Sequence, residues 1–261
     1  MAEKDASEDG GEHVVIVGAG GAIARHIALR VAAAGKHVIG IARSLDSLMM
    51  LADEMAAAGR GFLPLAADMA SDAAIAQIAG ALDRPVAMIV HSPGLPVAGG
   101  IRQAPTDALV EACNIKVGGL VRLVRSVEAR LRRGSRLVAI GGHYGFEPTA
   151  YAATAGVANA ALANLVRQLN WAYGPDGITA HLVAPGPVDS DRLRSVATAR
   201  ARSAGSTLEA ELGVMAAESA IGAFTTVDQI AWAVANLLAP EADAMAGSTL
   251  FLDSGRRRGL P

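Results

Sequence analysis

The chain has 261 residues, of which 52% are hydrophobic, and a formal net charge of -2 at pH 7. This length suits one large domain with a substantial core, and no break in composition argues for two. The near-neutral balance excludes the strongly basic class of proteins that bind nucleic acids or membrane surfaces. We therefore expect neither a nucleic acid nor a membrane as a partner.

The cysteine count and the N-terminal segment bear on the compartment. Cys113 is the only cysteine, so an internal disulfide is impossible and a cytoplasmic setting is expected. Residues 1–12 are acidic and polar, unlike a signal or transit peptide, and predict a flexible tail. No apolar run reaches the ~18 residues of a membrane-spanning helix, since Arg25, His26 and Arg30 interrupt the first candidate.

Short apolar runs alternate with segments of helical periodicity along the chain. The first run, at 13–17, ends in glycines and is followed by a helical segment at 22–36. This alternation is typical of a parallel sheet that helices cover on both faces. We predict one doubly wound α/β domain of the Rossmann type over 13–253, then a basic tail at 254–261 that is solvated or contacts another subunit. The other predicted strands are 37–42, 61–67, 86–91, 136–142, 178–186 and 248–253, and the other predicted helices are 44–58, 71–82, 106–133 and 149–173.

The turn after the first strand, GAGGAIA at 18–24, is the first candidate for ligand binding. Ligands of α/β sheets lie beyond the carboxyl ends of the strands. Gly18, Gly20 and Gly21 would let the backbone approach a pyrophosphate, whose charge would meet the free N–H groups at the helix start. A tight turn without a ligand uses the same glycines, but a place in the first strand–helix unit favours dinucleotide binding.

Two polar residues after the next strands bear on the choice of cofactor. Arg43 stands where an acidic residue would bind the ribose 2′-hydroxyl of NAD, and an arginine there suits a 2′-phosphate instead. NADP(H) is therefore favoured over NAD(H), and the alternative is a solvated arginine that opens a helix. Asp68 follows the third strand, where it would accept a hydrogen bond from an adenine amino group or cap the next helix.

In this order, the motifs resemble those of the short-chain dehydrogenase/reductase family over nearly the whole chain. VGAGGAIA lies where the family has its glycine motif, ADM holds its adenine-contacting Asp, HSPG replaces NNAG, and CNIKVGG places Asn114 on the catalytic Asn. YAATA falls on the YxxxK motif, so the resemblance implies that Tyr151 is the proton donor. VAPGPVDSD falls on the turn beside the nicotinamide, and GSTLFLDSG resembles the last strand. The further cofactor contacts that the resemblance implies are Ile23, Ser44, Met69, Ser92, Pro93, Gly94, Pro185, Gly186 and Val188.

The chain departs from the family pattern at three places. Ala22 and Ala24 replace two glycines, which is a mild change because alanine still permits close helix packing. Gly141 and Gly142 stand where the family usually carries its catalytic serine, and Ala155 stands where the YxxxK lysine would be. Both the hydroxyl that holds a substrate carbonyl and the ammonium that activates the tyrosine are therefore missing from their usual positions.

Lysines that could replace the missing ammonium are few. Lys4 lies in the tail, and Lys36 precedes the second strand at the far edge of the sheet from the cofactor. Lys116 follows Asn114 by two residues, and on a helix this spacing turns it to a different face. If Asn114 points into the site, we expect Lys116 to point away.

Four other polar residues are candidates for the missing groups. Asn159 shares a helical face with Tyr151 but lies about 12 Å further along the axis, which is too far to help. His143 and His91 end strands, and each would either donate a hydrogen bond to a substrate oxygen or serve as a structural loop residue. Tyr144, beside His143, is a rival for the role of acid.

The missing lysine affects the expected direction of the reaction. An unperturbed tyrosine has a pKa near 10, so a neutral phenol is expected at neutral pH. Oxidation of an alcohol needs the tyrosinate, whereas reduction of a carbonyl produces an alkoxide that a neutral phenol can protonate. We therefore expect an NADP(H)-dependent reductase of a small-molecule carbonyl. A cofactor-binding protein without redox activity, a lyase or isomerase using the same cleft, and Tyr151 as a packing residue remain open.

The segment at 187–225 is expected to be a mostly helical insert that covers the substrate, as the resemblance implies. Its Arg192, Arg194, Arg200 and Arg202 suit an anionic ligand or, as is commoner for charges at helical spacing, a solvated face.

Three further expectations concern surfaces and the core. Small residues lie on almost every face of the helix at 149–173, and the resemblance implies that this helix joins subunits of a homodimer or homotetramer. Met49 and Met50 are predicted to face the core. No metal site is predicted.

Overall fold

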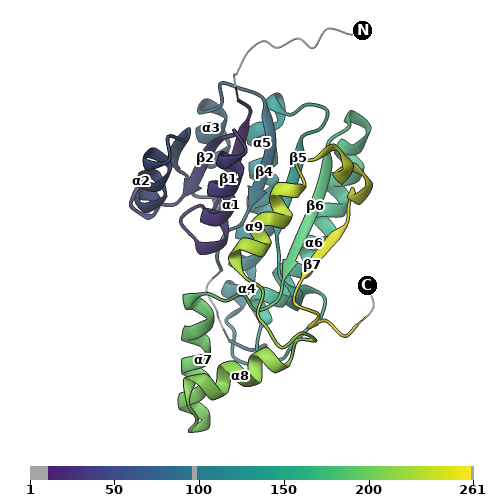
Figure 1. The fold of residues 1–261 in the computed structure, drawn as a ribbon. Helices are drawn as coiled ribbons and strands as arrows, with labels where there is room; N and C mark the ends of the chain where they lie inside the picture. The colour runs from purple at the N-terminus through teal and green to yellow at the C-terminus, as the bar shows by residue number, and fades with distance from the viewer. Residues whose placement is uncertain (1–10, 96–98, 260–261) are drawn as a thin grey trace.

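The computed structural model describes residues 11–95 and 99–259, which form one α/β domain (Figure 1). Its strands are β1 (His13–Val17), β2 (His37–Ala42), β3 (Phe62–Ala66), β4 (Val86–His91), β5 (Arg136–Ile140), β6 (Thr179–Pro185) and β7 (Thr249–Leu252). They form a parallel sheet of seven strands in the order β3-β2-β1-β4-β5-β6-β7. The order reverses between β1 and β4, which is the switch point of a doubly wound sheet. The predicted fold class is confirmed.

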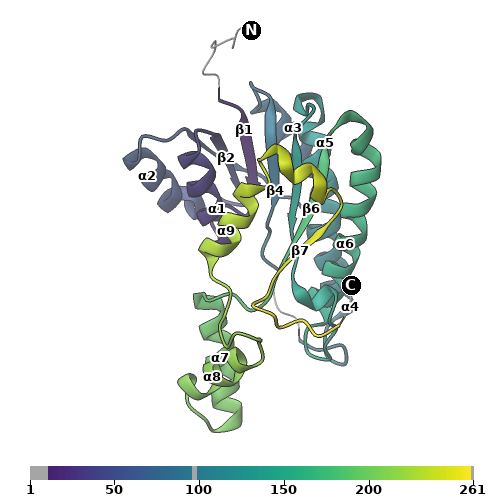
Figure 2. The same cartoon turned by 45° about the vertical axis from the view of Figure 1, so that its right-hand side comes forward.

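Both faces of the sheet are buried, because successive side chains of a strand alternate between faces and each face meets a layer of helices. Val14 and Ile16 of β1 pack in one hydrophobic cluster, whereas Val15 and Val17 pack in the other. A continuous β-branched run such as HVVIV therefore fits a strand without a solvent face. The first layer consists of α1 (Ala22–Ala33), α2 (Met49–Ala57) and α9 (Val227–Asn236), and the second of α3 (Ala73–Gly80), α5 (Gly119–Val127) and α6 (Ala153–Tyr173) (Figures 1 and 2).

The helix predicted from Ser44 begins as a 3-10 turn at Leu45–Leu48. A 3-10 turn has 3.0 residues per turn instead of 3.6, so it changes which residues of α2 face the sheet. Met49 and Met50 are exposed as a result, and the prediction that they face the core is wrong. Leu51 and Met55 of α2 are buried instead.

Two other predicted helices differ from the structure near the strand ends. The helix predicted at 106–133 is divided, because α4 (Thr106–Cys113) passes through a π-helical turn at Asn114–Gly118 before α5 begins. Single π turns are frequent at functional sites. The helix predicted from Thr149 begins at Ala153, so Tyr151 lies in the turn that precedes α6 rather than on the helix.

The predicted insert forms two helices, α7 (Asp191–Ala204) and α8 (Leu208–Ala217), that project beyond the carboxyl ends of the strands (Figures 1 and 2). A small apolar cluster of Leu193, Ala197 and Met215 joins the two helices. The prediction that this segment is mostly helical is confirmed.

Residues on both sides of the predicted domain limits, 13 and 253, contact the domain. Glu12, assigned to the N-terminal tail, forms ion pairs with Lys36 and Arg132, and the rest of that predicted tail, with Lys4, lies outside the described residues. In the C-terminal segment, Arg256 pairs with Glu218 of the segment after α8. Residues 254–259 therefore pack on the domain instead of forming a solvated tail. None of the helices in the described part of the chain has the length and apolar character needed to cross a membrane.

Candidate active site

The glycine turn between β1 and α1 is closely packed. Gly18 has a φ of +79°, and a Cβ atom on it would stand 2.3 Å from the Ser92 carbonyl oxygen. A Cβ on Gly20 would stand 2.4 Å from the Ser47 carbonyl oxygen. The backbone N–H groups of Gly18 and Ala19 both donate to the Ile41 carbonyl oxygen, at 2.8 and 3.2 Å. Only glycine fits at 18 and 20 without moving a neighbouring backbone.

The start of α1 is suited to an anion. Gly21 is the N-cap residue, no side chain caps the helix, and its first turn contains no acidic residue. The first N–H groups of the helix, including that of the half-buried Ile23, therefore have no intrahelical acceptor and carry the positive end of the helix dipole. A tight glycine turn followed by an uncapped helix of 12 residues fits a dinucleotide pyrophosphate.

The predicted adenosine-side residues follow β2 and β3. Arg43 and Ser44 are exposed after β2, whereas Met69 after β3 is buried. Asp68 accepts a hydrogen bond from the Ala70 N–H at 3.0 Å, and Asp72 is the N-cap residue of α3. Asp68 therefore closes a turn and does not cap the helix, which removes one of the two interpretations of this residue.

The predicted nicotinamide-side residues follow β4 and β6 on the same edge of the sheet. Ser92 donates its N–H to the Val17 carbonyl oxygen at 3.1 Å and leads into Pro93 and Gly94. Gly186 directly follows β6, and a Cβ on it would stand 2.9 Å from Asp253. Pro185 is the last residue of β6, and Val188 forms an isolated β-bridge with Thr225.

Two tyrosines meet at this edge. The Tyr144 and Tyr151 hydroxyl oxygens are 3.1 Å apart, and the rings are edge to face with centroids 5.7 Å apart. Burial raises the pKa of Tyr144 far above its ordinary value, and the hydrogen bond to Tyr151 raises it further. The Tyr151 side chain is 47% exposed, and the Arg200 guanidinium of α7 lies 5.3 Å from its ring centroid. Tyr151 therefore has a cationic neighbour in Arg200, although the lysine that the family carries in its YxxxK motif is replaced by Ala155.

A cavity of about 390 Å³ opens beside the two tyrosines. His143 is buried in its wall, with its ring centroid 4.0 Å from that of Tyr144. Burial lowers the pKa of His143, and the charge of Arg256 lowers it further, which favours the neutral ring. The other residues that line the cavity are Glu147, Thr149, Tyr151, Glu218, Arg256 and Arg258.

Asn114 and Lys116 lie in the π turn, and their side chains point in the opposite directions to those expected from the sequence. Asn114 donates to the Ala70 carbonyl oxygen at 3.2 Å and accepts from Arg122 at 3.0 Å, so it faces the loop after β3. Lys116 is only 6% exposed, and its Nζ donates to the carbonyl oxygen of Ile140, the last residue of β5, at 2.7 Å. Burial lowers the pKa of Lys116 to about 8, and the charge of Arg192 contributes. Lys116, not Asn114, points to the strand ends.

His91 has a structural place. Its side chain is fully buried at the end of β4, and Nε2 donates to the Ile115 carbonyl oxygen of the π turn at 3.1 Å. Burial lowers its pKa to about 3, and the Lys116 charge acts in the same direction, so the ring stays neutral. A side chain without exposed surface cannot reach a substrate, and the alternative of His91 as a substrate donor is wrong.

Asn159 of α6 lies beside Gly142 of the loop after β5. A Cβ atom on Gly142 would stand 2.9 Å from the Asn159 Nδ2. Because the loop after β5 folds back onto α6, Asn159 meets the position where the family carries its serine. This contact is with the position of the missing serine, and the expectation that Asn159 lies too far from Tyr151 to replace the lysine stays a prediction.

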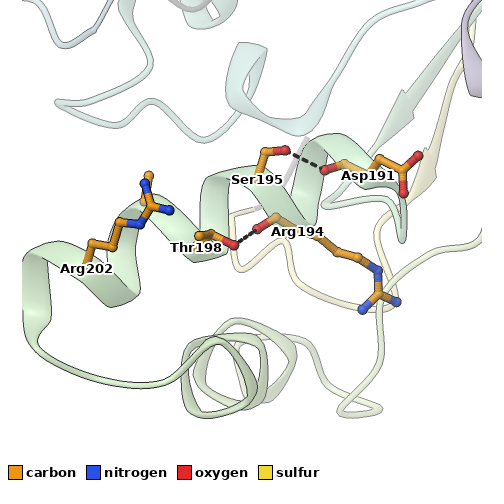
Figure 3. A pocket seen from close by; sticks show the side chains of 6 residues that line it. Asp191, Arg194, Ser195, Thr198 and Arg202 are labelled. Carbon is orange, nitrogen blue, oxygen red and sulfur yellow. Dashed lines mark hydrogen bonds between the residues drawn. The ribbon is translucent and has the colours of Figure 1, made fainter.

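The insert carries a second hollow, of about 480 Å³, whose lining residues all belong to α7 (Figure 3). Within it, the hydroxyls of Ser195 and Thr198 donate to carbonyl oxygens of their own helix at 2.9 and 2.8 Å. Arg194 pairs with Asp189 at 3.1 Å. These polar groups serve the helix itself, so we place the chemistry in the tyrosine-lined cavity.

The fold and the site together define a class. A parallel sheet with a glycine turn at its switch point and a tyrosine at its carboxyl edge is the arrangement of the short-chain dehydrogenase/reductases. Residues 18–257 match the family described as enoyl-(acyl carrier protein) reductase, and the chain belongs to this short-chain dehydrogenase/reductase family of oxidoreductases.

Curated relatives agree with this assignment. The chain is 26% identical over 247 residues to the 3-oxoacyl-acyl-carrier-protein reductase FabG of Salmonella typhimurium, a match that covers 94% of this chain and 97% of the relative. It is 25% identical over 250 residues to the short-chain reductase protein NovJ of Streptomyces niveus, with 93% and 92% covered.

Solved structures share the fold. L-sorbose reductase from Gluconobacter frateurii, complexed with NADPH and L-sorbose, superposes with a TM-score of 0.89 at 22% identity and covers 96% of this chain and 98% of its own. A variant of actinorhodin polyketide ketoreductase with NADPH gives a TM-score of 0.87 at 23% identity, with the same coverage.

Proposed function

We propose that this oxidoreductase uses NADPH to reduce a carbonyl group on a small molecule, with Tyr151 as the proton donor. The observation that carries the proposal is the pair of hydrogen-bonded phenols, Tyr144 and Tyr151, beside a cavity at the carboxyl edge of a dinucleotide-type sheet. NADPH in the solved structures of similar fold and the reductase activity named for the relatives support it.

The residues that would hold NADPH lie on three turns of this edge. The Gly18–Gly21 turn and the start of α1 would bind the pyrophosphate, and Arg43 would bind the 2′-phosphate. The turns after β4 and β6 would flank the nicotinamide, which supplies the hydride when bound. Arg43 is exposed and free to turn toward a phosphate.

Proton transfer would run through the two phenols. As the carbonyl is reduced, its oxygen gains negative charge and takes a proton from Tyr151. The half-exposed Tyr151 can regain that proton from solvent, and Tyr144 supports it by a hydrogen bond. The raised pKa of Tyr144 keeps this second phenol protonated throughout. A neutral phenol pair favours reduction over alcohol oxidation, because oxidation needs a tyrosinate as base.

Lys116 would supply positive charge to the same edge. Its ammonium is held at the end of β5 by the Ile140 carbonyl oxygen, and the side chain is only 6% exposed, so it would act on the site through its charge. Nearby positive charge stabilises an alkoxide, most strongly where water is excluded. Lys116 would thus take over the electrostatic part of the role that the YxxxK lysine has in the family.

The test is NADPH oxidation, followed by absorbance, with acetoacetyl-CoA as a 3-oxoacyl thioester and L-sorbose as a keto sugar. The wild type is expected to oxidise NADPH only when one of these carbonyls is present. Tyr151→Phe should lower kcat about 100-fold, as removal of a general acid does, without changing NADPH binding. Tyr173→Phe, which removes the phenol that bonds Glu128 at 2.9 Å, is the matched control and should keep its activity.

Two results would contradict the proposal. Tight NADPH binding without oxidation of NADPH by either carbonyl would indicate a cofactor-binding protein without redox activity. Equal losses in the Tyr151 and Tyr173 variants would show that Tyr151 has no special part in proton transfer.

A further inference from the structure

We propose that Asn159 is a catalytic residue whose side-chain amide replaces the family's missing serine hydroxyl and donates a hydrogen bond to the reacting substrate oxygen. This inference rests on the proposed reductase function and adds to it a residue from α6. Three features of the described residues carry it: the space beside Gly142, the packing of the loop after β5, and an unsatisfied buried amide.

Gly142 and Asn159 share one space. The Asn159 Nδ2 stands 2.9 Å from where a Cβ on Gly142 would be, which is closer than a side chain at 142 could tolerate. A serine hydroxyl extends about one C–O bond beyond such a Cβ atom. The Asn159 amide therefore lies within reach of the place from which the serine would act, and the two groups exclude each other.

The loop after β5 packs closely against α6 at Asn159. A Cβ on Gly145 would stand 2.8 Å from the Asn159 carbonyl carbon and 2.9 Å from its Cβ atom, so glycine is needed for the loop to touch α6 at this turn. On the other side, a Cβ on Gly141 would stand 3.0 Å from Leu182 of β6. Three glycines thus hold the loop between β6 and α6, with Asn159 at the point of contact.

The amide itself is poorly satisfied by the protein. Asn159 is 5% exposed, and its Oδ1 is buried without a hydrogen-bond partner among the described residues. An unpaired buried polar atom costs stability, and native structures keep few of them. An apolar residue of similar size would avoid this cost. Oδ1 can only accept a hydrogen bond, so the donor of this amide is Nδ2, and among the described residues Nδ2 has no acceptor. Its N–H groups are therefore left for an acceptor that arrives with the substrate.

The chemistry needs a donor at this place. During reduction the carbonyl carbon gains a hydride, the π electrons move to the oxygen, and the oxygen then takes a proton from a phenol. An N–H group aimed at that oxygen binds it more strongly as its negative charge grows, which lowers the barrier. No bond to Asn159 forms or breaks. The amide takes the serine's role as hydrogen-bond donor, and Tyr151 keeps the role of proton donor.

The test compares Asn159→Leu, Asn159→Ala, Gly142→Ser and the double variant Gly142→Ser with Asn159→Ala in NADPH oxidation with acetoacetyl-CoA. Asn159→Leu keeps the volume and removes the donor, so kcat should fall about 100-fold while Tm stays equal or rises. Gly142→Ser should also be impaired, because its hydroxymethyl group collides with the Asn159 amide. Gly142→Ser with Asn159→Ala restores a hydroxyl and removes the collision, and it should be at least 10-fold more active than either Gly142→Ser or Asn159→Ala alone.

Asn164→Ala is the matched control, because Asn164 lies exposed on the same helix and, among the described residues, bonds only Gln168, at 2.5 Å. Normal turnover by Asn159→Leu would overturn the role of Asn159 and leave the proposed reductase function standing. A double variant that is no more active than its single variants would do the same. If the wild type shows no NADPH oxidation with acetoacetyl-CoA or L-sorbose, the proposed function fails and this inference fails with it. If Asn159→Ala does not fold, Asn159→Leu tests the proposal by itself. Its Tm reports any loss of stability, and its kcat reports the loss of the hydrogen-bond donor.

Discussion

Replacement of Lys116 by methionine should change how stability depends on pH. Burial lowers the pKa of Lys116 to about 8 from its ordinary value of 10.5. Between these two values the folded state binds fewer protons than the unfolded state, so stability rises as pH rises through this window. At 1.36 kcal/mol for each pKa unit, the charged lysine costs the folded state about 3 kcal/mol at pH 7.

The assay is urea unfolding of the wild type and Lys116→Met at pH 7 and pH 9.5. By pH 9.5, about 2 kcal/mol of the cost should be relieved in the wild type but not in the variant, which has no proton to lose. The wild type should therefore gain about 2 kcal/mol relative to Lys116→Met between the two pH values. Other titrating groups cancel in this comparison. If the free energies of unfolding of the wild type and Lys116→Met differ by the same amount at both pH values, the placement of a charged amine in the interior is refuted.

Three further predictions test the cofactor site, the core and the assembly. Arg43→Ala should raise the Kd for NADPH about 10-fold or more and leave that for NADH unchanged in a fluorescence titration, since only NADPH has the 2′-phosphate; equal effects would contradict the assignment. Arg136, fully buried, donates to the Leu237 carbonyl oxygen at 2.7 Å and to Thr179 at 2.9 Å, so Arg136→Ala leaves a cavity and unpaired acceptors and should lower the free energy of unfolding by about 3–5 kcal/mol in urea, and a loss below 1 kcal/mol would contradict this. We also predict a homodimer or homotetramer joined through α6, where Trp171 is 81% exposed, and sedimentation at micromolar concentration that shows only monomer would remove this prediction.

The fold could be predicted because local signals and the global arrangement agree. Apolar runs such as HVVIV and VAMIVH are typical of strands buried on both faces, and each is followed by glycine, proline or a polar residue where the chain turns. Gly18 is the clearest example, since its φ of +79° and the close Ser92 carbonyl both require glycine. The cofactor side of the site follows from the same pattern, because residues after parallel strands must share one edge of the sheet.

The catalytic side could not be predicted, because it depends on how helices turn and on which loops touch them. Spacing correctly places Lys116 and Asn114 on different faces, but only the π turn decides which of the two faces the strand ends. The sequence gives only the distance of Asn159 along a helix from Tyr151, but Tyr151 precedes that helix and the loop that carries Gly142 folds back onto it. The glycines of GGHYG were the signal that this loop packs closely.

The site also contains cations that the sequence did not assign to it. The sequence offers Arg200 either as a contact for an anionic ligand or as part of a solvated face, but neither interpretation pairs it with Tyr151, over whose ring it lies. Arg256 was placed in a basic tail, but it lines the cavity and pairs with Glu218. Both contacts join segments far apart in the chain, and no local pattern of residues reports such pairing.

The most direct test of hydride transfer uses NADPH that carries deuterium on the transferred position of its nicotinamide. The protein is incubated with this cofactor and acetoacetyl-CoA, and the product is analysed by mass spectrometry. A product alcohol with one deuterium on the former carbonyl carbon is the predicted result. Binding of the cofactor without deuterium in any product would contradict the account and leave Tyr144 and Tyr151 without a part in reduction.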